Sequence, residues 1–170
     1  MQSSSRKFRR QSILSSDYLA NVNIRKLIVE YLEEAKVMQL ATSVDDQPWV
    51  CNVWFAADKD LNIYWFSIKT RRHSKEIMKN NKVAGNFALP KFGPLDKVRC
   101  VEFEGVASEL TDRKDVEKAV AVYADRIFTR DRIEQLTMTK PYAFYKAKPK
   151  LFVLFDAVNF PEDPRQELRV

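Results

Sequence analysis

The residues of this sequence that are best suited to chemistry lie in one short stretch, from Ser67 to His73. The stretch holds the hydroxyl groups of Ser67 and Thr70, the guanidinium groups of Arg71 and Arg72, and the only histidine of the chain, His73. A phosphate dianion binds best to several O–H or N–H donors and at least one guanidinium, which can donate two parallel hydrogen bonds. The free N–H groups at a helix start attract the same charge. The stretch is therefore a candidate phosphate site, and a solvated basic helix after a core strand is the alternative.

An aromatic run leads into this stretch. Residues 62–67 (NIYWFS) have the composition of a strand. Aromatic side chains at alternating strand positions belong most often to the core, so Tyr64 and Trp65 are expected in the wall of the fold. Phe66 and Trp54 are the side chains that could instead stack on a bound ring.

The two cysteines, Cys51 and Cys100, lie inside apolar runs that are typical of strands. A buried, reduced thiol is expected at both positions. No base is evident beside Cys51, so we interpret it as a packed thiol rather than a nucleophile. With one histidine and no CxxC pair, a zinc site is not expected.

Hydrophobic periodicity and turn signals predict the elements that position these residues. Apolar residues spaced three and four apart predict four helices. The first covers residues 23–36, the third begins at Thr111-Asp112 and the fourth covers 131–136. The second ends at Asn80 and begins at Thr70 or Ser74, either of which can cap it. Strands are predicted over 37–44, 49–57, 62–67, 82–89, 98–110, 142–146 and 151–157. Residues 45–48 are predicted as a turn and 90–96 as a loop, and a bulge at Gly105 is expected to bend its strand. No element is predicted after residue 159.

These elements predict a mainly β fold with flanking helices. Six or seven strands with short turns indicate a small closed or partly closed antiparallel barrel, with helices at its ends. An open sandwich is the alternative. The chain has only three glycines, which excludes both a phosphate-binding P-loop and a GxGxxG fingerprint.

Composition and charge predict one domain, over residues 17–170, after a disordered basic extension of residues 1–16. The chain has 170 residues, 45% of them hydrophobic, and a net charge of +6. The extension contributes four of these charges, from Arg6, Lys7, Arg9 and Arg10, so the remainder carries only +2. This distribution argues against a nucleic-acid-binding domain. No apolar run approaches the roughly 18 residues of a membrane span, so a soluble, cytoplasmic protein is expected.

Six segments, in this order and spacing, resemble one family. They are PWVCNVWF (48–55), NIYWFS (62–67), TRRH (70–73), VAG (83–85), VEFEG (101–105) and residues 151–159. Together they resemble the pyridoxamine 5'-phosphate oxidase-like FMN-binding split barrels, and more closely an uncharacterised bacterial branch of that superfamily. The resemblance covers about residues 24 to 160 and implies an antiparallel split β-barrel.

The resemblance also implies a flavin site in a groove between two subunits of a homodimer. The flavin ring would lie along Asn52, Val53 and Trp54. The phosphate would be held where the third strand ends and the next helix begins, by Ser67 with Arg72 and His73.

At three positions near this site, the side chain differs from the one common in the family or is one of two candidates. The family usually has lysine where this chain has His73, and an unperturbed histidine is mostly neutral at pH 7. Arg71 stands where many relatives carry a small hydroxyl residue, and it can compensate for the lost charge. Arg99 or Cys100 falls where the family offers a side chain to the flavin from a long strand, and Arg99 is chemically the better candidate.

The implied function is that of a flavoprotein oxidoreductase, in which FMN exchanges a hydride with a small substrate. No catalytic residue is assigned. The chain ends in NFPEDPRQELRV and lacks the C-terminal segment rich in Trp, Arg and His that true pyridoxamine phosphate oxidases share, so vitamin B6 oxidation is not expected. One alternative is a non-catalytic module that stores flavin or binds haem. A second is binding to nucleic acid or an anionic surface through residues 1–16.

Overall fold

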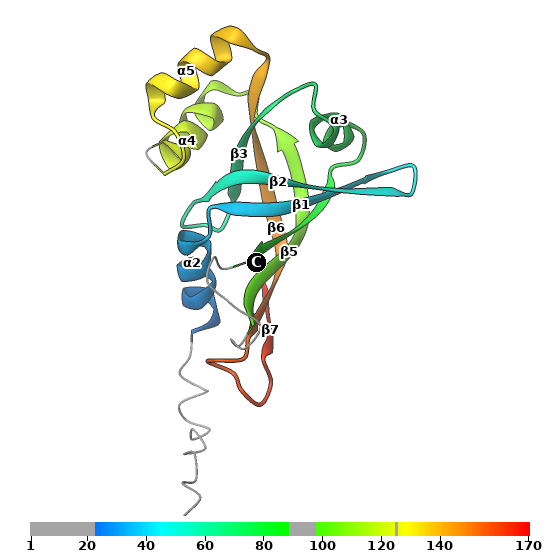
Figure 1. The fold of residues 1–170 in the computed structure, drawn as a ribbon, viewed down its shortest axis with the longest axis vertical. Helices are drawn as coiled ribbons and strands as arrows, with labels where there is room; N and C mark the ends of the chain where they lie inside the picture. Colours follow the sequence, from blue (N-terminus) through cyan, green and yellow to red (C-terminus); the bar gives the residue numbers. More distant parts are fainter. Residues whose placement is uncertain (1–22, 89–97, 125) are drawn as a thin grey trace, which may run out of the picture.

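The computed structural model describes residues 23–88, 98–124 and 126–170. Over these ranges it has four helices and seven strands (Figure 1). In chain order they are α2 (Ile24–Glu34), β1 (Val37–Val44), β2 (Gln47–Ala57), β3 (Ile63–Ile68), α3 (Arg72–Lys79), β4 (Lys82–Ala88), β5 (Arg99–Glu109), α4 (Arg113–Tyr123), α5 (Arg130–Thr139), β6 (Tyr142–Asp156) and β7 (Arg165–Arg169). The predicted extension 1–16 and the predicted loop 90–96 lie outside the described residues.

The strands form an antiparallel ring. They are hydrogen-bonded in the order β3-β2-β1-β4-β5-β6-β7, and β3 also pairs with β6, which closes six strands on one another. Helices α4 and α5 lie together at one end of this ring, and α2 packs nearer the other end (Figure 1). The predicted small antiparallel barrel with flanking helices is confirmed. None of the helices in the described ranges is long and apolar enough to cross a membrane.

The β1–β2 hairpin turns at two residues only. Asp45 and Asp46 have φ values of 53° and 58°, the left-handed conformation that a two-residue hairpin turn requires at both positions. Val44 pairs directly with Gln47, so Gln47 and Pro48 belong to β2 and not to the predicted turn. The hairpin thereby carries Trp49 into the strand.

The C-terminal half differs from the prediction in two ways. The two predicted strands 142–146 and 151–157 are one strand, β6, because a register shift at Glu104/Gly105 in β5 accommodates Pro149 opposite Gly105. A further strand, β7, pairs with β6 in a tail where no element was predicted. Backbone hydrogen bonds to an exposed edge need little apolar sequence, so the hydrophobic pattern gave no signal for β7.

Gly105 is required by a close approach of two strands. A Cβ atom at this position would lie 2.8 Å from the Cα of Pro149 and would also overlap the carbonyl oxygen of Lys148. Replacing Gly105 with alanine is expected to destabilise the fold by about 1–3 kcal/mol, since backbone atoms must move apart. Urea unfolding measures the change, with the exposed neighbour Glu104→Ala as control. Equal unfolding midpoints for the two variants would contradict the assigned role of the glycine.

The core has two layers, and the alternation of β3 assigns its residues to them. Ile63 and Trp65 point into the barrel, where they join a cluster from all six ring strands and α2. Tyr64 and Phe66 point outward and pack beneath α4 and α5. All four side chains are buried, which confirms that Tyr64 and Trp65 belong to the wall. Ser67, the next residue on the inner face, thus lies at the end of the barrel interior.

Candidate cofactor-binding site

The ring opens between β2 and β3. The two strands pair only from Phe55 to Ala57, whereas β2 is paired with β1 from Gln47 to Trp54. The other edge of β2 over 47–54 has no strand partner among the described residues. A cavity of about 650 Å³ lies at this opening. An unpaired strand edge offers N–H and C=O groups at regular spacing, which suits a flat ligand with polar edges.

Eight of the ten predicted site residues line this one cavity. They are Asn52, Val53, Trp54, Phe66, Ser67, Arg71, Arg72 and His73. Thr70 instead lines a neighbouring groove that also contains Arg72. Arg99 lies elsewhere, at the start of β5, where its guanidinium is 6.0 Å from the ring of Tyr31. The fold therefore brings together the β2, β3 and α3 parts of the prediction, but not Arg99 of the same subunit.

The cavity has an aromatic side. Trp54 is 52% exposed, while Phe66 is buried and stacks on Tyr142, with ring centroids 4.7 Å apart. The hydroxyl of Tyr123 donates to the carbonyl oxygen of Trp54 at 3.5 Å. Trp54 is thus the aromatic side chain of the predicted set that is open to a ligand.

The same cavity also contains a positioned guanidinium. Arg72 Nε donates to Glu76 Oε1 at 2.7 Å, and the Arg72 guanidinium lies 4.3 Å from the ring centroid of Trp49. Glu76 is buried and also accepts a hydrogen bond from Thr42. Burial alone would raise the pKa of Glu76, but the bonds from Thr42 and Arg72 outweigh it and hold that pKa below its usual value. Because Glu76 accepts its hydrogen bond from Nε, the two Nη groups of Arg72 can donate hydrogen bonds to a ligand.

The start of α3 lies beside this guanidinium. Arg71 is the N-cap residue, and no side chain caps the helix within the described structure. The prediction that Thr70 or Ser74 caps it is wrong, because Ser74 Oγ donates to the Ile68 carbonyl at 3.1 Å. The first helical hydrogen bond runs from Lys75 N to Arg71 O, which leaves the N–H groups of the first turn for an anion.

His73 connects the phosphate stretch to β2. Its Nε2 atom lies 2.8 Å from Ser67 Oγ and its Nδ1 atom lies 3.3 Å from Cys51 Sγ. His73 is buried, so the surface position that a solvated basic helix would give it is wrong. The interpretation that no base lies near Cys51 is also wrong. Cys51 and Cys100 are free thiols as predicted, but both are half-buried rather than buried.

Both members of the His73–Cys51 pair are neutral near pH 7. Burial lowers the pKa of His73, and the positive charge of Arg71 lowers it further, against a smaller opposing effect of Glu76. Burial raises the pKa of the Cys51 thiol, and the charge of Glu76 adds to this. The thiol is therefore not activated as a nucleophile in this state.

Several lining residues were not predicted. They are Trp49, Cys51, Ile68, Tyr123, Phe128, Arg132, Leu136 and Tyr142. The period-two alternation of β2 places Trp49 and Cys51 on one face, so these two carried a usable sequence signal. Most of the others come from α4, α5 and the segment between them, whose position over β3 depends on tertiary packing alone.

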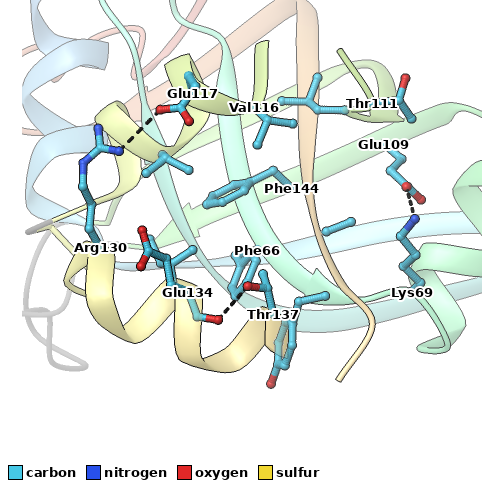
Figure 2. Close-up of a pocket in the computed structure, with 15 residues that line it drawn as sticks. Phe66, Lys69, Glu109, Thr111, Val116, Glu117, Arg130, Glu134, Thr137 and Phe144 are labelled. Atoms are coloured by element: carbon cyan, nitrogen blue, oxygen red, sulfur yellow. Dashed lines mark hydrogen bonds and ion pairs between the residues drawn. The ribbon is translucent and has the colours of Figure 1, made fainter. Parts of the chain in front are cut away.

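A second cavity adjoins the first. It has a volume of about 490 Å³, lies between α4, α5 and the barrel, and shares Phe66 and Tyr142 with the first cavity. Figure 2 shows Phe66 and Phe144 in its middle, with an ion pair on each side. These pairs are Lys69–Glu109 at 2.5 Å and Arg130–Glu117 at 3.4 Å. The cavity thus combines apolar walls with a charged rim.

The antiparallel ring of six strands, open where β2 and β3 separate, places the fold in the split-barrel class. The chain belongs to the pyridoxamine 5'-phosphate oxidase-like family, since the family model described as "Pyridoxamine 5'-phosphate oxidase" matches residues 24–154. Members of this family include flavin-binding and haem-binding proteins, and they commonly form dimers.

Three relatives illustrate the range of similarity. A UPF0306 protein from Photorhabdus laumondii is 26% identical over 91 residues, which are 53% of this chain and 63% of that protein. The solved structure of a conserved hypothetical protein, Rv2991, from Mycobacterium tuberculosis has a TM-score of 0.68 at 16% identity and covers 82% of this chain and 89% of its own. HutZ, a haem storage protein from Vibrio cholerae, has a TM-score of 0.63 at 18% identity and covers 75% and 91%. At 16% and 18% identity, the similarity to these two solved structures shows a shared fold.

Proposed function

We propose that this protein is an FMN-binding, oxidoreductase-like protein that works as a homodimer. The observation that carries the proposal is the convergence of eight expected residues on one 650 Å³ cavity, which combines Trp54 and an open strand edge with Arg71, Arg72 and a helix start. This arrangement fits a flat ring joined to a phosphate.

Each end of the ligand has candidate partners in this chain. The phosphate would be held by Ser67, Arg71, Arg72 and the first-turn N–H groups of α3. The ring would lie along Asn52 to Trp54. Thr70 lies outside this cavity, in the neighbouring groove, and Arg99 would reach a flavin only from the partner subunit.

The chemistry would come from the cofactor, since a bound flavin supplies hydride transfer. The chain's own residues would orient the flavin and exclude water from it. The adjoining cavity with Phe66 and Phe144 suits a small, mainly apolar substrate at the flavin edge.

Homodimerisation is proposed on the exposed apolar side chains of β2. Val50 and Trp54 are 58% and 52% exposed on one face of this 11-residue strand, and Trp49, on its other face, is 40% exposed. Exposed large apolar side chains close to one another mark an interaction site, and a second copy packed on β2 would cover Val50 and Trp54 and close the groove. Sedimentation that finds only monomers would count against the dimer.

Purified protein is expected to be yellow with flavin or to take up added FMN, with quenching of flavin fluorescence on titration. Replacing Ser67 and Arg72 together by alanine is expected to weaken this uptake, because the phosphate loses a hydroxyl and a guanidinium donor. A colourless protein that leaves FMN fluorescence unchanged would overturn the proposal.

Haem binding or flavin storage without turnover is the second candidate, because HutZ has the same fold. His73 is the chain's only histidine, and both of its ring nitrogens contact Ser67 or Cys51, which disfavours it as a haem ligand. Absorbance difference spectra with haem and with FMN, recorded side by side, separate the two cofactors.

Binding of anionic surfaces by residues 1–16 is a separate proposal, and it predicts that deleting these residues abolishes such binding.

A further inference from the structure

We propose that Cys51, His73 and Ser67 form a directed hydrogen-bond relay that aims the Ser67 hydroxyl hydrogen at the bound phosphate. In this relay Cys51 is a positioning residue, which acts on the ligand through His73 and Ser67. The inference rests on the proposed function, because it concerns the same site with a phosphate monoester, FMN, bound in it.

The contacts allow two arrangements of protons. A neutral imidazole carries one N–H, and the bond made by one nitrogen sets the role of the other. In the first arrangement His73 Nδ1–H faces Cys51 Sγ, Nε2 accepts the Ser67 proton, and Ser67 has no hydrogen left for a ligand. In the second, the Cys51 S–H donates to Nδ1 and Nε2–H donates to Ser67 Oγ, at the observed 3.3 Å and 2.8 Å separations. Only the second lets Ser67 donate to a phosphate.

A phosphate dianion selects the second arrangement, because its oxygens accept hydrogen bonds and offer none. Each bond in the chain then points toward the anion, and aligned hydrogen bonds polarise and strengthen one another. The relay requires a neutral imidazole and a protonated thiol. Burial favours both neutral forms, since it lowers the pKa of His73 and raises the pKa of Cys51.

The surrounding charges are consistent with this. Arg71 opposes a charge on His73, and the carboxylate of Glu76, which favours one, is already bonded to Arg72 and Thr42. The relay thus explains how a histidine can stand where the family usually has lysine. It supplies a directed donor, while Arg71 and Arg72 supply the fixed charge.

The single histidine makes the proton positions measurable. In ¹⁵N-labelled protein saturated with FMN, the imidazole nitrogen signals come from His73 alone and are expected to show the neutral Nε2–H tautomer. The neutral Nδ1–H tautomer, or an imidazolium that donates from both nitrogens, would overturn the relay.

A matched pair of variants tests the role of the thiol. Cys51→Ala removes the donor to Nδ1 and is expected to weaken FMN binding about 3- to 10-fold, the effect of one hydrogen bond. Cys51→Ser keeps a donor and is expected to restore both the affinity and the Nε2–H signal. Equal affinity of wild type and Cys51→Ala, with FMN bound to both, overturns the relay and leaves the proposed function standing. Wild-type protein that binds no FMN overturns both.

Discussion

Replacing Arg72 with alanine is expected to weaken FMN binding by more than about 100-fold. The Arg72 guanidinium can donate two charge-assisted hydrogen bonds to the phosphate, each worth about 1.5–3 kcal/mol. The variant also leaves the buried Glu76 carboxylate without its cationic partner, in the neighbouring groove that Arg72 also lines. An unpaired negative charge there repels the phosphate, so the loss exceeds that of the hydrogen bonds alone. Fluorescence titration of FMN measures the affinity.

The contribution of Glu76 can be separated by a double variant. Arg72→Ala with Glu76→Gln is expected to bind FMN more tightly than Arg72→Ala alone, because the repelling charge is gone.

Arg72→Lys keeps the positive charge but loses the planar guanidinium, and about a tenfold loss of FMN affinity is expected. Lys75→Ala is the matched control, since Lys75 is an exposed cation of the same helix that does not line the 650 Å³ cavity. If Lys75→Ala and Arg72→Ala weaken binding equally, only general charge matters and the assigned contact is wrong.

Replacing Asp156 with alanine is expected to destabilise the fold by about 3–5 kcal/mol. Asp156 is fully buried at the end of β6. Its carboxylate accepts hydrogen bonds from the Tyr31 hydroxyl, the backbone N–H groups of Val158 and Asn159, and the Asn159 side chain. It thereby ties α2 to the barrel, and its removal leaves several buried donors without an acceptor. Urea unfolding measures the loss, with exposed Asp163→Ala as the control that should change little.

The effect of Asp156 depends on pH in a defined direction. Burial alone would raise its pKa, but the hydrogen bonds from Tyr31, Asn159 and Val158 outweigh it and lower the pKa from its ordinary value of 3.8. A carboxyl with a lowered pKa in the folded state stabilises that state above its unfolded pKa, and the contribution is lost as pH falls through the folded pKa. The stability difference between wild type and Asp156→Asn is therefore expected to be full at pH 7 and to shrink below about pH 4. A difference that is constant from pH 7 to pH 3 would contradict this.

Most of the fold could be predicted from the sequence. Periodicity identified α2, the first five strands, α4 and α5, with shifts of a few residues at their ends, because each has one buried face with a regular spacing. The bulge at Gly105 was also predicted, and the structure shows the register shift there. The continuity of β6 through Pro149 and the presence of β7 were missed, since both depend on what the neighbouring strand offers rather than on local pattern.

For the candidate site, the sequence by itself determined the residue types: the hydroxyls, guanidinium groups and single histidine between Ser67 and His73, and the aromatic strand before them. Only the tertiary structure decided how they meet. The register of β2 against β1 and β3 places Cys51 against His73, and α3 places Glu76 against Arg72. Arg99, assigned to the flavin from family resemblance, lies beside Tyr31 and outside the cavity of its own subunit, so its proposed role depends on the partner subunit. The physical reason is that a residue's chemistry is carried by its own side chain, whereas its partners are set by strand register and helix packing over distances that local sequence does not encode.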